Sequence, residues 1–431
     1  MRPPAGTTGS KAPAEEPFIL AAMLSLLGAS LWIALHPGLL LQFYYSPEML
    51  ALTHLVTLGF VTALMMGVLL RLAPMALECA PRSRAAALVQ CALFLVGASG
   101  MVIHFAIGAW VGLAWSTLLV LAAALLQAFN FSAVFARARR GDQPSLHAAA
   151  AMVNLVLAAS LGASFGMLRA YGLGTSWLTA PLLDRIAAHL HLALVGWITT
   201  LILGLQHKLL PPTIGSRGWL PLRFLALQGG LWLSVTCLLT GWPGRALGAA
   251  LVLAALVAHA AGALAAFSAR RSDVWEIVAL GLLLLLGATG LLLALDLPDP
   301  AAPLRLRVEF AYGVVALFGW ACLTISSTAF KLFPRWVWEE RFLPELRATG
   351  ARVPAPATLF SQRLRHASGA LLLAGSLATA GGMLADDADV VAVSAWVLFA
   401  GVVAFVANFA RTARWALLRG EWTPPPDGAA H

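Results

Sequence analysis

Residues 189–211 read HLHLALVGWITTLILGLQHKLLP, an apolar stretch that contains three of the ten histidines in the chain. A helix that crosses a bilayer needs roughly 20 apolar residues, and this stretch is long enough. Ionisable side chains inside such a helix cost free energy and usually mark a function. His189, His191 and His207 are therefore the first candidates for functional residues.

The composition of the whole chain is that of an all-α polytopic membrane protein. Its 431 residues are 60% hydrophobic and 11% charged, whereas soluble domains are about 25% charged. Twelve apolar segments predict twelve transmembrane helices, near 17–35, 50–73, 85–105, 107–136, 147–169, 186–210, 219–240, 244–269, 273–296, 308–333, 366–386 and 389–412. We expect a disordered tail over 1–16, one membrane domain over 17–412 and a second tail over 413–431.

The net charge of +9 reports orientation in the bilayer rather than a nucleic-acid partner. If the N-terminus lies inside, all but five of the 28 lysines and arginines fall in inner loops and tails. Acidic residues such as Asp386, Asp387 and Asp389 fall outside. This distribution follows the positive-inside rule. It predicts a multi-pass protein of a bacterial inner membrane with both termini cytoplasmic.

A threefold internal repeat extends outward from the opening stretch. HLVTLGFVTALMMGVLLRLAP (54–74), HLALVGWITTLILGLQHKLLP (191–211) and VVALFGWACLTISSTAFKLFP (314–334) align without gaps. They share a glycine, an aromatic residue, a small residue, a cation and a proline at fixed offsets, and such periodicity indicates repeated units. The three stretches are the second, sixth and tenth predicted spans. The chain is therefore predicted to form three four-helix arcs, 17–136, 147–269 and 273–412, related by a pseudo-threefold repeat.

This architecture resembles subunit I of the haem–copper oxidases. The HxHxxxxGW…G…P pattern that begins at His189 is similar to the helix of the C-type branch whose first histidine binds the high-spin haem and whose second binds the low-spin haem. The resemblance implies that His189 and His191 are iron ligands. It also implies that His54, which opens the second-span stretch, is the other low-spin ligand. The cofactor would be haem b, with one or two copies.

The sequence also departs from the oxidase pattern. The HxH motif lies on the sixth span instead of the tenth, the tenth span has no histidine, and residues 219–240 lack the family's copper histidines. The position four residues after His191 is Val195 instead of the tyrosine found in many members. We therefore expect neither a complete copper site nor rapid oxygen reduction to water. The closer resemblance is to divergent, NnrS-like relatives associated with nitric oxide stress.

The expected function is thus that of a membrane haem protein that binds or turns over nitric oxide or passes electrons to a redox partner protein. Oxidoreductase activity stays open. Two alternatives from other classes are a twelve-helix secondary transporter and a haem-free structural or assembly subunit. Transporters are usually built from two related halves around ionisable groups at the bilayer midplane.

Among the histidines, His54 and His191 are the favoured pair of iron ligands, and His189 is the third candidate. Residues two apart on a helix diverge by about 200°, so His189 and His191 would face different pockets. His36 and His104 are either further ligands on the outer side or interfacial residues. His207, beside Lys208, is expected at the cytoplasmic interface, and His147, His259 and His366 are assigned structural roles.

Two further expectations concern charged residues near the ends of the spans. Arg71, Lys208 and Lys331 are predicted to extend to the inner headgroups. The segment 335–365, which mixes tryptophans with charges, is predicted to lie along the membrane surface. Glu309 and Tyr312 precede the third repeat, and either an interfacial or a proton-loading role fits that position.

Overall fold

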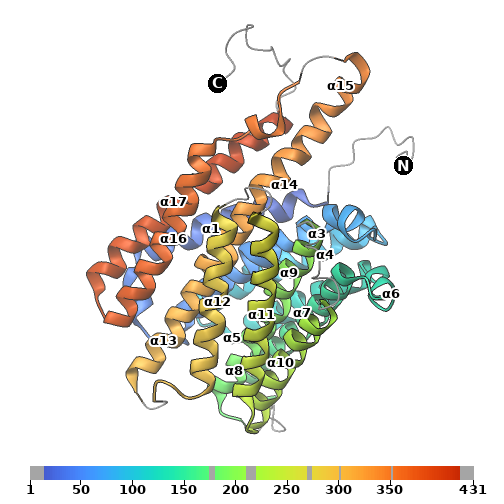
Figure 1. The fold of residues 1–431 in the computed structure, drawn as a ribbon. Helices are drawn as coiled ribbons and strands as arrows, with labels where there is room; N and C mark the ends of the chain where they lie inside the picture. The colour runs from blue at the N-terminus through green and yellow to red at the C-terminus, as the bar shows by residue number, and fades with distance from the viewer. Residues whose placement is uncertain are drawn as a thin grey trace.

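The structure is a computed structural model that describes residues 14–173, 180–209, 220–268, 274–299, 302–350 and 353–417. Within these residues the chain is helical and contains no strand. Twelve helices are long and apolar enough to cross a membrane, as the sequence predicts. In Figure 1, α15 lies at one end of the bundle, and α8 and α13 lie at the other.

The first four spans are α1 (Glu16–Leu35), the run α2 (Pro47–His54), η2 (Leu55–Thr62) and α3 (Ala63–Ala76), then α4 (Arg84–Ala106) and α5 (Trp110–Asn130). The next four are α7 (Gln143–Tyr171), the run α8 (Leu182–His191), η3 (Leu192–Thr199) and α9 (Thr200–Leu209), then α10 (Leu220–Thr240) and α11 (Arg245–Ser268). The last four are α12 (Val274–Ala294), the run α13 (Pro303–Val314), η5 (Val315–Cys322) and α14 (Leu323–Arg341), then α16 (Gln362–Ala385) and α17 (Ala388–Leu417). Short helices α6 (Ala133–Ala138) and α15 (Leu343–Thr349), with the turns η1 (Pro37–Leu41) and η6 (Pro356–Thr358), connect them.

The second, sixth and tenth spans each contain an eight-residue π-helical segment, η2, η3 and η5. Each segment begins one residue after the first residue of the repeated stretch, so His54, His191 and Val314 immediately precede the three segments. π-helical turns are rare and occur mostly at functional sites. The three stretches that align in sequence therefore also share an uncommon local backbone.

Close packing holds each π segment against the first helix of its own group of four. A Cβ added at Gly59 would lie 2.8 Å from Cβ of Ser25 on α1, and one at Gly196 would lie 2.7 Å from Cβ of Asn154 on α7. Such separations are shorter than van der Waals contact, so only glycine permits these helix crossings. The glycine shared by the repeats is thus a packing requirement.

The three repeated spans also bond to one another in the middle of the molecule. The indole Nε1 of Trp197 donates to Oγ1 of Thr62 at 3.3 Å, and that of Trp320 donates to Oγ1 of Thr199 at 3.1 Å. Both tryptophans are the aromatic residue of the repeat, and both acceptors lie at the last position of a π segment. The donor and acceptor positions are therefore equivalent in the two bonds.

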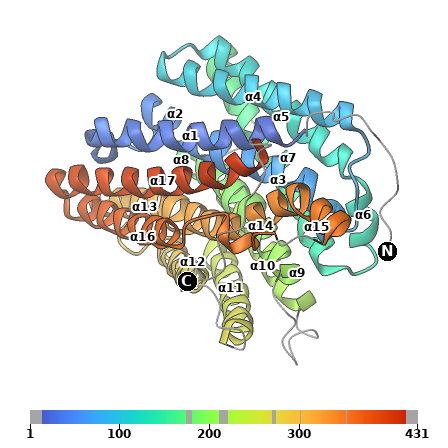
Figure 2. The same ribbon diagram turned by 90° about the horizontal axis from the view of Figure 1, so that it is seen from above.

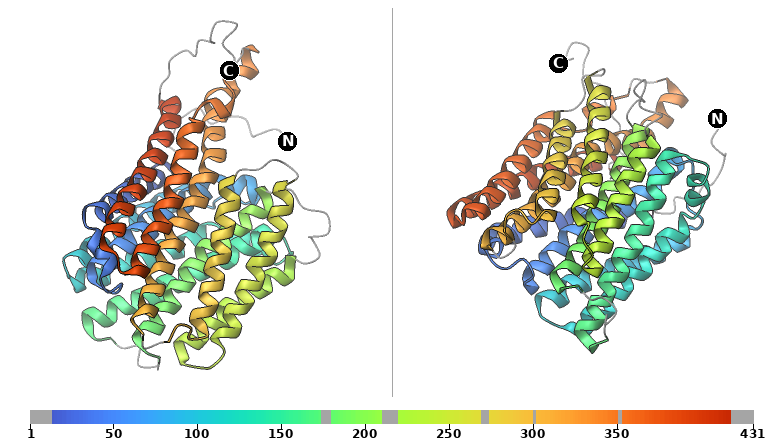
Figure 3. Two further views of the ribbon diagram at one scale, coloured as in Figure 1. Left: turned by 60° about the vertical axis from the view of Figure 1, so that its left-hand side comes forward. Right: turned by 60° about the horizontal axis from the view of Figure 1, so that its bottom comes forward.

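The remaining helices surround these three spans. α5 packs on α7, α11 packs on α12, and α17 packs on α1, so the last span contacts the first and the ring closes. Figure 2 shows α17 alongside α1, and Figure 3 shows α16 beside α17. Aromatic and aliphatic side chains from all three groups form one continuous core.

The helix of the tenth span extends beyond its predicted end at residue 333. α14 continues through Pro334 to Arg341, and α15 follows it directly. Val337, Phe342 and Leu359 form a small separate core that Trp415 of α17 covers. The position of this segment along the membrane surface stays a prediction.

Two smaller predictions are also revised. Arg71 and Lys331 pair with carboxylates: Arg71 Nη1 lies 3.4 Å from Glu15, and Lys331 Nζ lies 2.5 Å from the buried Glu276. The expectation that these cations extend only to headgroups missed these intramolecular pairs. The predicted C-terminal tail begins as helix, since α17 runs to Leu417. Residues 1–13 and 418–431, most of the two predicted tails, lie outside the described residues.

Candidate functional site

The three favoured histidines lie on the repeated spans at the ends of their first helical segments. His54 is the last residue of α2, and His191 is the last residue of α8, with His189 two residues before it. The change to π geometry directly after His54 and His191 widens the helix at that point. The sequence therefore places each of these two rings at a local irregularity of its span.

Each of the three rings uses the same nitrogen for a backbone contact. Nδ1 of His54 donates to the carbonyl of Leu50 at 2.7 Å, and Nδ1 of His191 donates to that of Ala187 at 2.7 Å. Nδ1 of His189 donates to the carbonyl of Ala158 on α7 at 3.0 Å. A donating Nδ1 fixes the neutral tautomer and leaves the Nε2 lone pair free, which is the arrangement of histidines that ligate metals.

His54 and His189 are the pair that the fold brings together. They are close enough for the charge of one ring to act on the other. The ring of His54 stacks on Phe105 of α4 at a centroid separation of 5.1 Å. The ring of His189 lies between Phe165 and Gly162 of α7, where an added Cβ would be 3.0 Å from its Cε1. Phe105 therefore orients the ring of His54, and Phe165 and Gly162 orient the ring of His189.

His191 faces a different part of the bundle. Its ring stacks with Tyr312 of α13 at 6.3 Å, with 30° between the planes. The two histidines of the HxH motif therefore contact different helices, as their angular separation predicts. Tyr312 was treated as an interfacial residue in the sequence, and no local signal there shows that it meets His191 from another span.

A polar group on the same side of the fold lies next to Tyr312. Glu309, one turn earlier on α13, accepts from the Tyr44 hydroxyl at 3.1 Å and from Arg305 at 3.0 Å. Burial and the neighbouring Glu309 raise the pKa of Tyr44 above its ordinary value. Tyr44 therefore stays a neutral hydrogen-bond donor and ties the loop after α1 to α13.

None of the three favoured histidines is fully buried as a residue. His54, His189 and His191 each keep part of their surface accessible, although buried apolar residues such as Val56, Ala188 and Leu192 flank them. A neutral imidazole with a free nitrogen and open surface can accept a planar iron-bearing group. The donor set and its accessibility therefore fit a haem.

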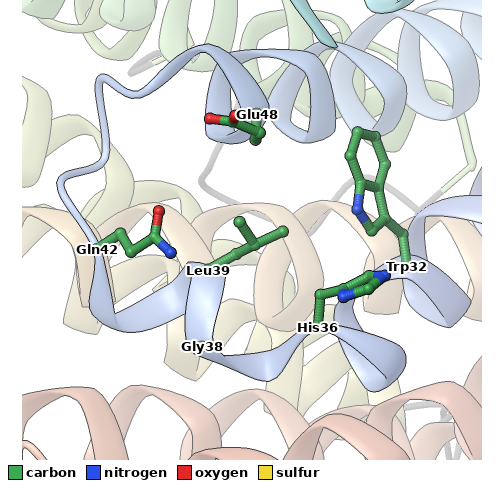
Figure 4. A pocket seen from close by; sticks show the side chains of 6 residues that line it. All are labelled: Trp32, His36, Gly38, Leu39, Gln42 and Glu48. Carbon is green, nitrogen blue, oxygen red and sulfur yellow. The ribbon is translucent and has the colours of Figure 1, made fainter.

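The two further candidates lie elsewhere. His36 is exposed and lines an open pocket of about 410 Å³ with Trp32, Gln42 and Glu48 (Figure 4). His104 turns toward α5, where its Nδ1 and Oγ of Ser116 are 3.1 Å apart and its Nε2 lies against Gly112. Neither ring joins the other three, so the structure does not support either as an additional ligand to them.

A second group of histidines, which the sequence treated as structural, comes together at the other end of the same spans. His147, His207 and His259 are in ring contact, with centroid separations of 4.9 and 5.4 Å. They come from α7, α9 and α11. No local sequence signal reveals this cluster, because its members come from three different helices.

No group of three or more histidine, cysteine, aspartate or glutamate side chains in the described residues is arranged to hold a metal ion. A haem needs only one or two protein ligands, so this observation concerns ions held by side chains alone. All four cysteines are free and buried and contribute no site of their own.

Comparisons with known proteins leave the family open. No family model matches the chain, and a search of curated proteins finds no match.

Proposed function

We propose that this membrane protein binds haem b at the end of the bundle that carries His54, His189 and His191. The observation that carries the proposal is the common geometry of these rings. Each donates Nδ1 to a backbone carbonyl and keeps Nε2 without a hydrogen bond among the described residues, and each residue keeps part of its surface exposed. The proximity of His54 and His189 favours these two as the residues that would hold one haem. The pair His54 and His191, which the resemblance implies, is the second choice.

The residues around the rings would perform distinct tasks. The backbone carbonyls of Leu50 and Ala158 would hold the two imidazoles neutral and fix their orientation. His191 would ligate a second haem or a diatomic-binding position, with Tyr312 beside it as a hydrogen-bond donor. A haem bound there would supply electron transfer or an open iron coordination position for nitric oxide.

A visible spectrum of the purified protein tests the proposal. Haem-replete expression should give a protein with the sharp reduced-minus-oxidised bands of a six-coordinate b-type haem. His54→Ala and His189→Ala should each lose most of that signal, whereas His36→Ala, a matched control in a separate pocket, should keep it. A colourless wild type, or full haem content in both ligand variants, would contradict the assignment and favour the haem-free structural alternative.

Nitric oxide distinguishes ligand binding from electron transfer. Added to the reduced protein, it should shift the spectrum of a haem held by His191, and His191→Ala should remove the shifted component. An unshifted six-coordinate spectrum would instead support electron transfer to a redox partner. The transporter alternative is less well supported, because Lys331, Arg71 and Arg305 pair with carboxylates near the ends of their spans rather than at the midplane.

A further inference from the structure

The helices of the second four-span group lack carboxylates over an unusually long stretch. From residue 185 to residue 272 the sequence contains no aspartate or glutamate. The same stretch contains cations and histidines at the end of the bundle that the charge distribution predicts to be cytoplasmic. In this chain, cations elsewhere at that end pair with acids, as Arg71, Arg137 and Lys331 do.

Arg223 is a partly buried cation in this acid-free region. It is the fourth residue of α10, and its Nη1 would lie 3.0 Å from a Cβ added at Gly262 of α11. Its Nε is buried and has no hydrogen-bond partner in the described part of the chain, and no ion pair of Arg223 occurs there either. The stretch 210–219 contains no carboxylate that could supply one.

Two members of the histidine cluster lie near this guanidinium. Arg223 is close enough to act electrostatically on His207 and on His259. Nε2 of His259 is 2.8 Å from Oε1 of Gln206, and Nδ1 of His147 donates to the Gln143 carbonyl at 2.9 Å. The half-exposed ring of His207 has aromatic contacts but no hydrogen bond among the described residues, so it is a free donor beside Arg223.

Lys208 in the same stretch pairs with Glu78 at 3.9 Å, whereas Arg223 has no ion pair among the described residues. A buried donor such as its Nε that lacks a partner is unfavourable. The N-terminal ends of α7 and α10 lie at this level, and helix N-termini add partial positive charge. An anion with several oxygen acceptors would accept hydrogen bonds from the guanidinium of Arg223 and from the unbonded ring nitrogen of His207 together. Phosphate has this geometry.

We propose that Arg223 and His207 bind the phosphate group of an acidic phospholipid in the predicted cytoplasmic leaflet. The site lies among the ends of α7, α9, α10 and α11, where headgroups meet the protein. Basic pockets between transmembrane helices on the cytoplasmic side are suited to such headgroups. The site is at the opposite end of these spans from His189 and does not depend on haem.

Thermal unfolding in nanodiscs of defined composition tests the site, with the fluorescence of the 15 tryptophans as the signal. A lipid that binds only the folded state raises the unfolding temperature. The wild type should unfold at a higher temperature in phosphatidylglycerol-containing discs than in phosphatidylcholine discs, and Arg223→Gln should abolish the increase. Native mass spectrometry should show the loss of one retained phosphatidylglycerol in the variant.

Arg365→Gln is the matched control. Arg365 is likewise the fourth residue of its helix, α16, but its Nη1 donates to Oε1 of Gln362 at 3.1 Å. This variant should keep the lipid-dependent increase. If Arg223→Gln fails to fold, Arg223→Lys is the second variant. It keeps the positive charge but loses the planar set of N–H donors, so it should reduce the lipid-dependent increase in unfolding temperature.

Inorganic phosphate distinguishes the two possible ligands of this site, a phospholipid headgroup and a free phosphate ion. Added to the protein in phosphatidylcholine discs against chloride at equal ionic strength, it should stabilise far less than phosphatidylglycerol does. Stabilisation by free phosphate with none from phosphatidylglycerol would overturn the assignment to a lipid. The proposed site would be wrong if Arg223→Gln kept the lipid-dependent increase in unfolding temperature, or if the wild type showed no such increase.

Discussion

A histidine inside a transmembrane helix has two ring nitrogens that need hydrogen-bond partners. The three favoured histidines use these nitrogens in the same way. Nδ1 of His54, His189 and His191 bonds to a backbone carbonyl, two of them one turn earlier on the same helix. The unfavourable transfer of a polar ring into apolar surroundings is thereby partly offset. The second nitrogen is left for an external ligand, and this distinguishes these rings from His104 and His259, whose side chains bond to other side chains.

His104→Ala separates a structural histidine from the proposed ligands. We expect the variant to retain its haem, because His104 bonds to Ser116 of α5 and lies outside the group of three. Loss of this hydrogen bond should lower the free energy of unfolding by about 1 kcal/mol. Haem absorbance and thermal unfolding, measured on the same preparation, report the two effects. Loss of haem with unchanged stability would show that His104 is a ligand.

The sequence identifies the candidate histidines, but it cannot identify all of their neighbours. The spacing within HxH predicts that His189 and His191 face apart, and they do meet different helices. The contact between His191 and Tyr312 joins residues 121 positions apart in the chain, and it depends on how two spans pack. The same reason applies to the cluster of His147, His207 and His259, whose members look unrelated in sequence.

At the level of elements, the twelve spans were predictable because each is a long apolar run with polar ends. The π-helical segments were not, because the extra residue in a π turn has no local composition of its own. A glycine followed by an aromatic residue recurs where η2, η3 and η5 form. The predicted tenth span ends at residue 333, whereas α14 passes through Pro334, and Trp336 and Val337 are buried beyond it.

A pair of alanine substitutions tests whether glycine sets the crossing of the repeated spans. Gly196→Ala places a Cβ 2.7 Å from Cβ of Asn154, and such overpacking typically costs about 1–3 kcal/mol. Gly281→Ala on α12 has no atom within 4 Å of the new Cβ and should leave stability unchanged or slightly higher. Thermal unfolding of both variants in one detergent measures the difference. Equal stabilities would indicate that the α7 crossing adjusts without cost.

For the whole molecule, the same order of helix contacts recurs in the first, middle and last four spans. In each group the first helix packs on the π segment of the second, and the third packs on the fourth. α1 contacts η2, α7 contacts η3, and α12 contacts η5. The pseudo-threefold relation itself stays a prediction, and it accounts for a central trio of spans joined by equivalent tryptophan–threonine bonds.

An ion-pair group on the side of α8 and α13 joins the second group of spans to the third. Asp296, just after α12, accepts from Arg245 at the start of α11 and from Arg305 of α13, the latter at 2.7 Å. Burial raises the pKa of Asp296, but the hydrogen bonds and charges of the two arginines outweigh it and hold the pKa below its ordinary value. Asp296 has φ 57°, a left-handed conformation that asparagine also tolerates.

The lowered pKa fixes the sign of the pH dependence. The ionised carboxylate stabilises the folded state at pH values above its unfolded pKa of about 3.9, and the contribution is lost as the pH falls through the lower folded value. Because the side chain is 40% exposed, we expect a contribution below about 1 kcal/mol. Asp296→Asn should therefore be slightly less stable than wild type near neutral pH and should lose less stability on acidification. Tryptophan-monitored unfolding at pH values above and below about 4 measures both, and an identical acid-induced loss in the two proteins would show that Asp296 does not join these helices energetically.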